Sequence, residues 1–382
     1  GMSFPDEETP GIDIVIPDFS YILENKDKIK GLVVTHGHED HIGAIPYLLR
    51  NFNLPIYATR LTIGLIEGKL KEHKLLAGAK LNVTDPGQKI ELGKFTVEFI
   101  HVNHSIPDAV GFAITCGAGT VVQTGDFKID TTPIDDNVID IARFAELGKK
   151  GVLALLSDST NAERPGFTPS ERLVGESFSN LFKKAEGHRI IVATFSSNIH
   201  RIQQIIDEAD RCDRKVIISG RSMQNVVNVA EELGYLNVPN DVLVELDAIK
   251  NYRPEELVII TTGSQGEPLS ALHRIAFSEH RQIELIPGDV IIISATPIPG
   301  NEKLVGKVIN ELMRRGANVV YEKMYDVHVS GHACAEELKL MMSVCKPKYF
   351  IPVHGEQKHL YKHSLLAKNV GIKEENIIIP IN

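Results

Sequence analysis

The sequence predicts an α/β protein built on largely buried sheets, and three observations carry that prediction. Apolar, β-branched runs alternate with amphipathic helical patterns along almost the whole 382-residue chain. Between Gly93 and Thr124 the strand-like runs are separated by short turns, which indicates antiparallel pairing. From Ser170 to about Val320 strands and helices alternate strictly, as in a parallel, doubly wound domain. We therefore expect two domains, with a boundary near Pro165–Ser170.

Strands are expected where short apolar runs are bounded by glycine, proline or charged residues. These runs are Leu32–Thr35, Phe95–Val102, Phe112–Thr115, Thr120–Thr124, Val152–Leu156, Ile190–Thr194, Val216–Ser219, Val258–Thr261, Val290–Ser294, Val319–Tyr321 and Tyr349–Val353. Helices are expected where apolar residues recur every three to four positions between the strands. These segments are Ile42–Asn51, Arg60–His73, Ser170–Lys184, Ile199–Arg211, Ser222–Leu233, Leu269–Phe277, Glu302–Arg315, Ala335–Cys345 and Lys358–Lys368.

The composition limits the partners that the chain can bind. Its formal charge of −9 and pI of about 5.9 argue against a basic surface that coats nucleic acid. A polyanion must therefore bind locally, and bound divalent cations can supply the positive field. The four cysteines form no C-x-x-C pair, which is typical of buried thiols in a reducing compartment. No apolar stretch approaches the roughly 20 residues that span a bilayer, so we expect a soluble, cytoplasmic protein without a membrane partner.

Four potential metal ligands lie within six residues after the first predicted strand. His36, His38, Asp40 and His41 form the pattern H-x-H-x-D-H between that strand and a helix. A single histidine is more often a satisfied core or surface residue than a ligand. Three imidazoles and a carboxylate on one turn reverse those odds, because they are the ligand set that zinc prefers and their burial is otherwise difficult to justify.

Two further candidate ligands, His104 and Asp126, also follow strand-like runs. Taken alone, His104 is typical of a surface turn, and Asp126 of a helix cap or turn. Strand ends meet at the edge of a sheet, so both residues can join the cluster at 36–41. Three histidines and an aspartate then make one site, and Asp126 can bridge to a second ion about 3.5–4 Å away.

A motif H-x-H-x-D-H followed by a lone histidine and a lone aspartate resembles the signature of the metallo-β-lactamase superfamily. The resemblance implies two zinc ions per chain, with Mn²⁺ as the alternative metal. The ligands that it implies are His36, His38 and His104 for one ion, Asp40, His41 and His354 for the other, and Asp126 as the bridge between them.

More than two hundred residues of α/β pattern precede His354, and this insertion resembles the β-CASP domain of nucleases. Asp158 in Ser-Asp-Ser-Thr and His332 in Ser-Gly-His match further motifs of that group. Stretches such as Ser196–Arg201 and Thr262–Pro268 resemble the ribonuclease J family, and this likeness runs along almost the whole chain.

The resemblance implies an α/β fold in which a metallo-β-lactamase αββα sandwich is interrupted by a Rossmann-like β-CASP insertion. The ranges are 1–168 for the first part of the sandwich, 169–325 for the insertion and 326–382 for the returning part. The implied activity is metal-dependent cleavage of RNA, as an endonuclease and a 5′-to-3′ exonuclease, in rRNA processing, RNA maturation and mRNA decay. The implied partners are single-stranded RNA with a 5′-monophosphate and, for the full-length protein, a second copy or a paralogue.

Three residues are candidates for catalysis. We expect a metal-activated water to attack phosphorus in line, with Asp40 accepting its proton. His332 donates a proton to the leaving 3′-oxygen or stabilises its charge. Asp158 orients a histidine, which fixes the tautomer and basicity of the ring. The alternative for Asp158 is a residue that caps a turn.

Candidate phosphate-binding residues lie on two loops. Ser196, Ser197 and Asn198 lie between a buried strand and a helix, where backbone N–H groups can hold a phosphate. Without the resemblance, helix capping is the favoured interpretation of these three residues. The resemblance implies that the second loop contacts the phosphates of the bound strand through His328, Ser330, Gly331 and His332. A pocket near these loops predicts a preference for 5′-monophosphate over 5′-triphosphate RNA.

Three alternatives remain open. A weakly active RNA-binding subunit that scaffolds a partner nuclease is disfavoured by the intact H-x-H-x-D-H motif. A thioesterase or lactonase of the same superfamily is disfavoured by the large insertion. A β-CASP DNA nuclease is set aside only by the resemblance. Compared with the family, N-terminal strands ending in an aspartate and a C-terminal oligomerisation domain are missing, so we expect a truncated chain that folds poorly or is much less active than the full one.

Overall fold

The chain forms two units that differ in the kind of sheet on which they are built. Unit 1 comprises Gly1–Pro169 and Ser330–Asn382, and unit 2 comprises Ser170–Val329, so unit 2 is an insertion into unit 1. The domain boundaries expected after residues 168 and 325 stay predictions. The fold is that of a computed structural model, which describes residues 1–2, 11–12, 14–298, 300–322 and 324–380.

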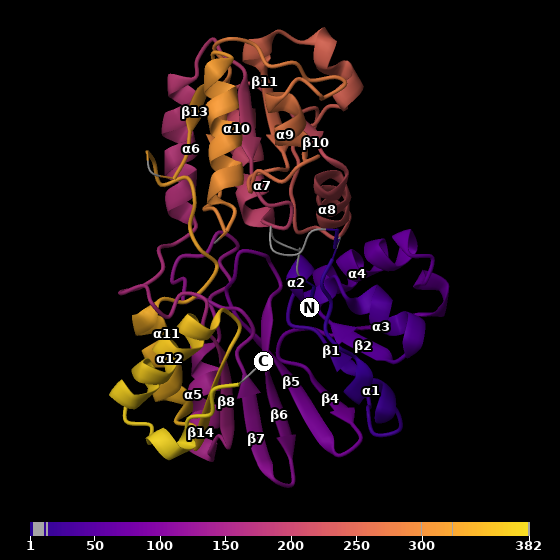
Figure 1. Ribbon diagram of the computed structural model, residues 1–382, viewed down its shortest axis with the longest axis vertical. Coiled ribbons are helices and arrows are strands. Elements are labelled where there is room, and N and C mark those ends of the chain that lie inside the picture. Colours follow the sequence, from indigo (N-terminus) through magenta and orange to yellow (C-terminus); the bar gives the residue numbers. More distant parts are fainter. Residues whose placement is uncertain (3–10, 13, 299, 323, 381–382) are drawn as a thin grey trace. The chain divides into compact units, whose positions relative to one another are not determined.

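The described residues of unit 1 form two sheets (Figure 1). The smaller sheet is parallel, with the order β1-β2-β3, and its strands are β1 (Leu32–Val33), β2 (Pro55–Ala58) and β3 (Lys80–Val83). The larger sheet has the order β14-β8-β7-β6-β5-β4, and its strands are β4 (Lys89–Leu92), β5 (Phe95–His101), β6 (Val110–Cys116), β7 (Gly119–Gln123), β8 (Ala154–Asp158) and β14 (Tyr349–Val353). Pairing is antiparallel from β4 to β7 and parallel from β7 to β14. The sequence predicts the antiparallel pairing of β5, β6 and β7.

The helices of unit 1 cover the outer faces of these sheets. They are α1 (Ser20–Glu24), α2 (Glu39–Ile42), α3 (Ile45–Asn51), α4 (Arg60–Glu72), α5 (Ile141–Lys150), α11 (Ala335–Cys345) and α12 (Gln357–Asn369), with short 3-10 helices at Leu76–Gly78 and Glu374–Asn376.

Successive side chains of each strand point to opposite faces, and they divide unit 1 into layers. Phe99 and Phe112 of the larger sheet share a core with Val33 and Tyr57 of the smaller one, so the two sheets pack face to face. On the other face of the larger sheet, Leu155 belongs to a core formed with α5, α11 and α12 (Figure 1). The other face of the smaller sheet packs against α3 and α4. The predicted αββα sandwich is confirmed.

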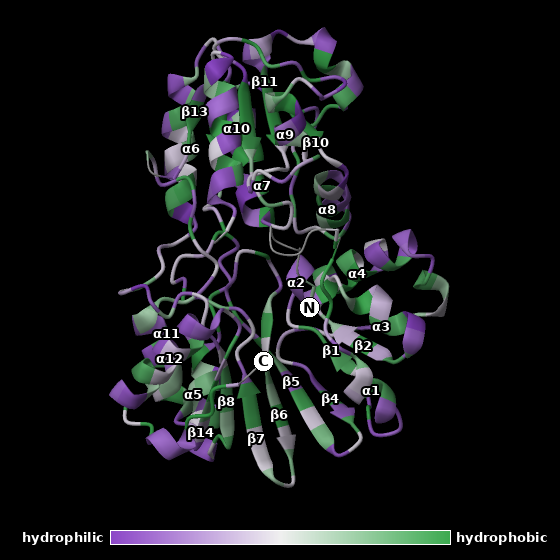
Figure 2. Ribbon diagram, in the orientation of Figure 1, coloured by the Kyte–Doolittle hydropathy of each residue, from purple (hydrophilic) through white to green (hydrophobic). Residues whose placement is uncertain are grey.

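Unit 2 is built on a parallel sheet with the order β10-β11-β9-β12-β13. Ile190 and Val192 are as fully buried as Ile191 and Ala193, so helices cover both faces of the sheet, as expected of a doubly wound domain. Figure 2 shows the same pattern, with hydrophobic strands and helices that carry both colours. The elements are β9 (Ile190–Ala193), β10 (Lys215–Ser219), β11 (Leu257–Thr261), β12 (Val290–Ile293), β13 (Asn318–Val320), α6 (Arg172–Lys184), α7 (Ile199–Arg211), α8 (Arg221–Glu232), α9 (Ala271–Ala276) and α10 (Glu302–Arg314), with 3-10 helices at Leu246–Asn251 and Pro254–Glu256.

The sequence misses several elements of unit 1. The single helix expected at Ile42–Asn51 is wrong: α2 ends at Ile42, and α3 starts at Ile45 with Pro46 in its first turn, where a missing N–H is tolerated. The strands β2, β3 and β4 and the helix α5 were not expected. Both β3 and β4 are short and half exposed, so they lack the apolar run that marks a buried strand. Within the part of the chain that the structure describes, no helix is long and apolar enough to cross a membrane.

Candidate metal centre

The turn after β1 presents the H-x-H-x-D-H motif. His38 has an extended backbone and directly precedes α2, a helix of four residues that contains Asp40 and His41. The end of one strand and one helical turn therefore hold all four side chains. His104 and Asp126 lie in the loops that follow β5 and β7, and His354 directly follows β14. The edge of the larger sheet thus brings the distant candidates to the same turn.

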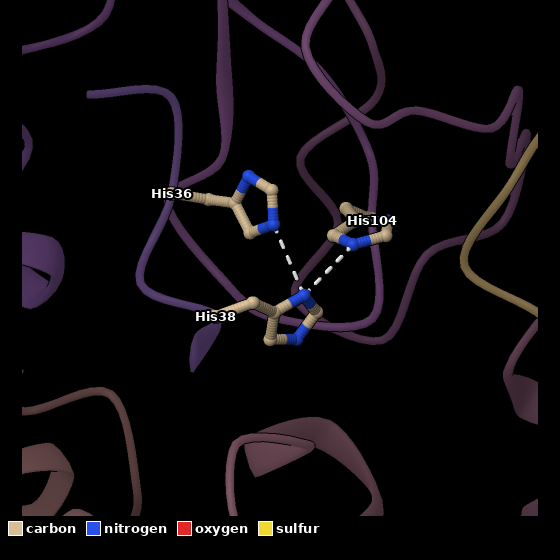
Figure 3. Close-up of side chains that lie close together, drawn as sticks. All are labelled: His36, His38 and His104. Atoms are coloured by element: carbon tan, nitrogen blue, oxygen red, sulfur yellow. Dashed lines mark hydrogen bonds between the residues drawn. The ribbon is translucent and has the colours of Figure 1, made fainter. Parts of the chain in front are cut away.

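Three histidine nitrogens converge on one point (Figure 3). Nδ1 of His38 lies 3.0 Å from Nε2 of His36 and 3.1 Å from Nε2 of His104. One ring nitrogen offers either one proton or one lone pair, so His38 Nδ1 cannot make a normal hydrogen bond to both neighbours. A cation at the common point explains the convergence, since zinc–nitrogen bonds of about 2.0–2.1 Å place tetrahedral ligands about 3.4 Å apart.

A second set of four atoms forms a cage beside the first. Nε2 of His41 lies 3.4 Å from Oδ2 of Asp40 and 3.2 Å from Oδ2 of Asp126. Nε2 of His354 lies 3.2 Å and 3.4 Å from the same two oxygens. These separations also match the edges of a tetrahedron of nitrogen and oxygen ligands around one divalent ion.

One oxygen atom of the second set also lies near two nitrogens of the first. Oδ2 of Asp126, which is almost fully buried, lies 3.8 Å from Nε2 of His36 and 3.9 Å from Nε2 of His104. A carboxylate oxygen that lies between two ligand sets is suited to bridge a pair of ions.

The two sets differ in their electrostatics. Burial lowers the pKa of His38 to about 4 and holds the pKa of His36 and of His104 well below the usual value, so these rings offer lone pairs. In the second set burial also opposes charge, but hydrogen bonds to the carboxylates raise the pKa of His41 to about 10 and that of His354 to about 9. A cation in the second set would displace these protons.

The ring nitrogens that face away from the two sets have partners that orient the rings. The hydroxyl of Thr35 lies 3.0 Å from Nδ1 of His36, and the hydroxyl of Thr160 lies 2.8 Å from Nδ1 of His354. The carbonyl oxygen of Gly331 accepts a hydrogen bond of 2.7 Å from Nδ1 of His104. Position 331 requires glycine, because a Cβ atom there would lie 2.7 Å from the same nitrogen.

Thr35 and Thr160 are not among the site residues that the sequence predicts. The only local signal was their position, since Thr35 directly precedes the metal motif and Thr160 ends the Ser-Asp-Ser-Thr stretch. Hydroxyl residues are common in such turns for other reasons, so position alone does not identify them.

The structure places Asp158 and His332 together beside the two ligand sets. Oδ2 of Asp158 accepts a hydrogen bond of 2.8 Å from Nδ1 of His332, whose ring packs against the rings of His104 and His354. Burial opposes charge on His332, yet the Asp158 carboxylate raises its pKa above the usual value. The other oxygen of Asp158 accepts from the backbone and hydroxyl of Thr160, so the residue also caps its turn.

The candidate phosphate residues divide between the two units. In unit 2, Oδ1 of Asn198 accepts from the backbone N–H of Arg201 and caps α7, and the side chain of His328 lies 3.3 Å from the Arg201 guanidinium. Ser196 and Ser197 are half-buried in the same turn. In unit 1, Ser330 accepts a hydrogen bond from Asn161, and Gly331 binds His104 as described above. Phosphate binding by these loops stays a prediction.

Comparison with known proteins identifies the parts of the chain. Residues 9–161 match the metallo-beta-lactamase superfamily, residues 187–312 match the beta-CASP domain of ribonuclease J, and residues 316–380 match the Zn-dependent metallo-hydrolase RNA specificity domain. The first of these matches implies that the chain binds divalent metal, and the two ligand sets fit such ions.

Curated relatives match along the entire chain. Ribonuclease J of Helicobacter pylori is 48% identical over 380 residues, which cover 99% of this chain and 55% of that protein. Ribonuclease J 1 of Streptococcus pyogenes is 47% identical over 382 residues, which cover 100% of this chain and 68% of that protein. The chain therefore spans little more than half the length of some of its relatives.

A solved structure supports the fold alone. A protein of unknown function from Enterococcus faecalis V583 superposes with a TM-score of 0.63 at 14% identity, over 92% of this chain and 79% of that one. The identity to curated relatives is more specific, because it extends over the sandwich, the insertion and the returning segment together. The chain belongs to the ribonuclease J family of the metallo-β-lactamase superfamily.

Proposed function

We propose that the chain cleaves phosphodiester bonds in single-stranded RNA with two divalent metal ions, zinc or Mn²⁺. The observation that carries the proposal is the pair of adjacent ligand sets, with Oδ2 of Asp126 in one set and close to two nitrogens of the other. RNA as the substrate rests on the relatives named Ribonuclease J and on the match to an RNA specificity domain. The proposed action is both endonucleolytic and 5′-to-3′ exonucleolytic.

The proposed ligands follow from the two sets of converging atoms. His36, His38 and His104 would hold one ion, Asp40, His41 and His354 the other, and Asp126 both. Imidazole and carboxylate donors suit zinc and accommodate manganese, so the donor set restricts the metal without choosing between these two.

In the proposed mechanism, side chains around the ions carry out the proton transfers. Bound divalent ions make a nucleophile available from water near neutral pH and stabilise negative charge on phosphoryl oxygens. Asp40, whose side chain is half exposed, accepts the proton of the attacking water. His332 donates a proton to the leaving 3′-oxygen or stabilises its charge, and Asp158 holds the ring in the required orientation through Nδ1.

The proposed setting is RNA maturation and decay in the cytoplasm, including rRNA processing and mRNA decay. The preferred substrate is RNA with a 5′-monophosphate, held by the loops at Ser196–Asn198 and His328–His332. The proposed protein partner of the full-length molecule is a second copy or a paralogue.

The experiment that tests the function is cleavage of RNA labelled at either end, combined with elemental analysis of the same protein sample. The expected result is stepwise release of nucleotides from the 5′ end together with internal cuts, at about two metal ions per chain. Undiminished cleavage by metal-free protein contradicts the metal mechanism. Faster cleavage of a DNA strand of the same sequence favours a DNA nuclease, and binding of RNA without cleavage by metal-loaded protein favours a scaffold subunit.

A further inference from the structure

A concentration of positive charge lies in unit 2, outside the residues of the candidate metal centre. It surrounds a pocket of about 240 Å³ at the carboxyl end of β10. Arg221 at the start of α8, Arg274 on α9 and Arg281 on the following loop line the pocket. The described residues that line it include no carboxylate. In a chain of net charge −9, a local cluster of three arginines indicates a site for an anionic ligand.

The arginines of this pocket differ from the buried arginines elsewhere in unit 2. Arg189 pairs with Asp289, and Arg201 pairs with Glu171. In contrast, Nε of Arg274 is buried and has no hydrogen-bond partner among the described residues. A buried donor without an acceptor is costly, and the negative charge of an anion close to this guanidinium would offset part of that cost.

The backbone and a hydroxyl add further donors. Among the residues that the structure describes, no side chain caps the N-terminus of α8, and Gly220 precedes this helix with φ +116°. Nδ1 of His280 accepts from the backbone N–H of Ile283, 3.0 Å away, so Nε2 carries the proton and donates it to the hydroxyl of Ser219, 3.2 Å away. That hydroxyl can then donate its own proton to a ligand.

We propose that this pocket binds a phosphate group, either of the RNA strand or of a free mononucleotide. Forked guanidinium donors and a helix N-terminus are both suited to phosphate, whose several oxygens can accept from more than one arginine at once. The register Ser219↔Thr261↔Ala193 places the pocket two strand spacings, about 10 Å, from the predicted phosphate loop after β9. A strand bound at that loop could therefore reach the pocket. The RNA source rests on the proposed function, whereas the mononucleotide source does not.

The test compares two double variants that remove the same charge. Arg221→Gln with Arg281→Gln alters two exposed side chains of the pocket, and Arg253→Gln with Arg314→Gln alters two exposed arginines elsewhere in unit 2. Binding of a single-stranded RNA 12-mer is measured in chelator at several salt concentrations, and binding of AMP by equilibrium dialysis. Melting temperatures verify that all variants fold.

We expect the pocket variant to bind RNA about tenfold more weakly, with the slope of log affinity against log salt reduced by about 0.7 for each phosphate that the protein no longer neutralises. The control variant should bind RNA less than about twofold more weakly than wild type. Loss of AMP binding with unchanged RNA binding identifies a free nucleotide as the source of the phosphate. Equal losses in both variants, or unchanged binding of both ligands in the pocket variant, overturn the site.

Cleavage of RNA by the metal-loaded wild-type protein separates this inference from the proposed function. Failure to cleave, together with weaker RNA or AMP binding in the pocket variant, leaves the phosphate site in place and removes the nuclease activity. Normal cleavage by the wild-type protein, together with unchanged RNA and AMP binding in the pocket variant, supports the nuclease activity and overturns the phosphate site.

Discussion

The carboxylate of Asp158 lies 2.8 Å from Nδ1 of His332, although 174 positions separate the two residues in the chain. Because Asp158 accepts the proton on Nδ1, Nε2 is the nitrogen of His332 left for the reaction. A ring nitrogen of His332 lies within 4.8 Å of the ligand atoms of His104 and Asp126. The pair is thus placed to move a proton beside the candidate metal ions.

His332→Ala should retain about two metal ions and bind RNA, yet lose turnover by about 10²–10⁴-fold. Asp158→Asn keeps the size of the side chain but weakens the hold on Nδ1, so kcat should fall by about 10–100-fold with little change in KM. Single-turnover cleavage and elemental analysis of both variants provide the measurement. Loss of metal from the His332 variant would make that histidine a ligand and overturn its assigned role.

Asp126→Ala should weaken the binding of both metal ions, because Oδ2 of Asp126 belongs to one ligand set and lies 3.8 Å and 3.9 Å from two nitrogens of the other. His354→Ala removes one donor from one set only, so about one ion should remain after dialysis. The measurement is metal content against free metal concentration for each variant. Identical loss in the two variants would contradict the bridging position of Asp126.

RNA with a 5′-monophosphate should be degraded roughly tenfold faster than RNA with a 5′-triphosphate if the loop at Ser196–Asn198 binds the terminal phosphate. Ser197→Ala removes a hydroxyl from this loop but leaves the Asn198 cap of α7 intact, so it should reduce the preference without lowering stability. Rates on the two substrates are compared for wild type and variant. If the wild-type protein degrades the two RNAs at equal rates, the loop at Ser196–Asn198 does not bind the terminal phosphate.

His363 should make the protein less stable as the pH falls. It is fully buried on α12, with Nδ1 2.9 Å from the hydroxyl of Ser159, and burial lowers its pKa to about 3. Its folded-state pKa is below the unfolded value of about 6.5, so unfolding takes up a proton between pH 6.5 and 3. The stability present above pH 6.5 is therefore lost on acidification, by about 2 kcal/mol at pH 5.

His363→Asn should flatten this dependence, since the amide can still bond to Ser159 but does not titrate. Denaturant unfolding of wild type and variant at pH 8 and pH 5 gives the difference. The control is His188→Asn, which alters an exposed histidine. This substitution should leave the pH dependence of the free energy of unfolding unchanged. The prediction is contradicted if the unfolding free energy of the His363 variant falls between pH 8 and pH 5 as much as that of the wild type.

The buried ion pair of Arg201 and Glu171 should be essential for the folding of unit 2. Arg201 is completely buried, with Nε 2.7 Å from Oε1 of Glu171 and Nη1 3.0 Å from the carbonyl of Ser294. Arg201→Gln removes the cation from a buried carboxylate and should destabilise the protein by about 3–5 kcal/mol. The exposed Arg314, changed to Gln, should cost less than about 1 kcal/mol. Similar denaturation midpoints for the two variants would contradict this.

Periodicity in the sequence predicts the central strands because each one carries a nearly continuous apolar run. β11, Leu257–Thr261, is fully buried at every position and was expected almost to the residue. Periodicity fails for β3 and β4, whose half-exposed residues gain their pairing partners only when the sheet assembles. Pro46 was visible in the sequence, but its effect of starting a new helix depends on the local path of the chain.

The sequence by itself determined the core of the metal cluster, because His36, His38, Asp40 and His41 fall within one turn and share a neighbourhood whatever the rest of the chain does. Only the tertiary structure decided which atoms converge. The pairing of β14 with β8 brings His354 beside Asp158, and the partners of the outer ring nitrogens come from Thr160 and Gly331. The three arginines of the pocket in unit 2 were likewise invisible, because residues 53 and 60 positions apart meet only through the packing of the loops around β10. Local spacing fixes chemistry within a turn, whereas long-range contacts depend on the geometry of the sheet.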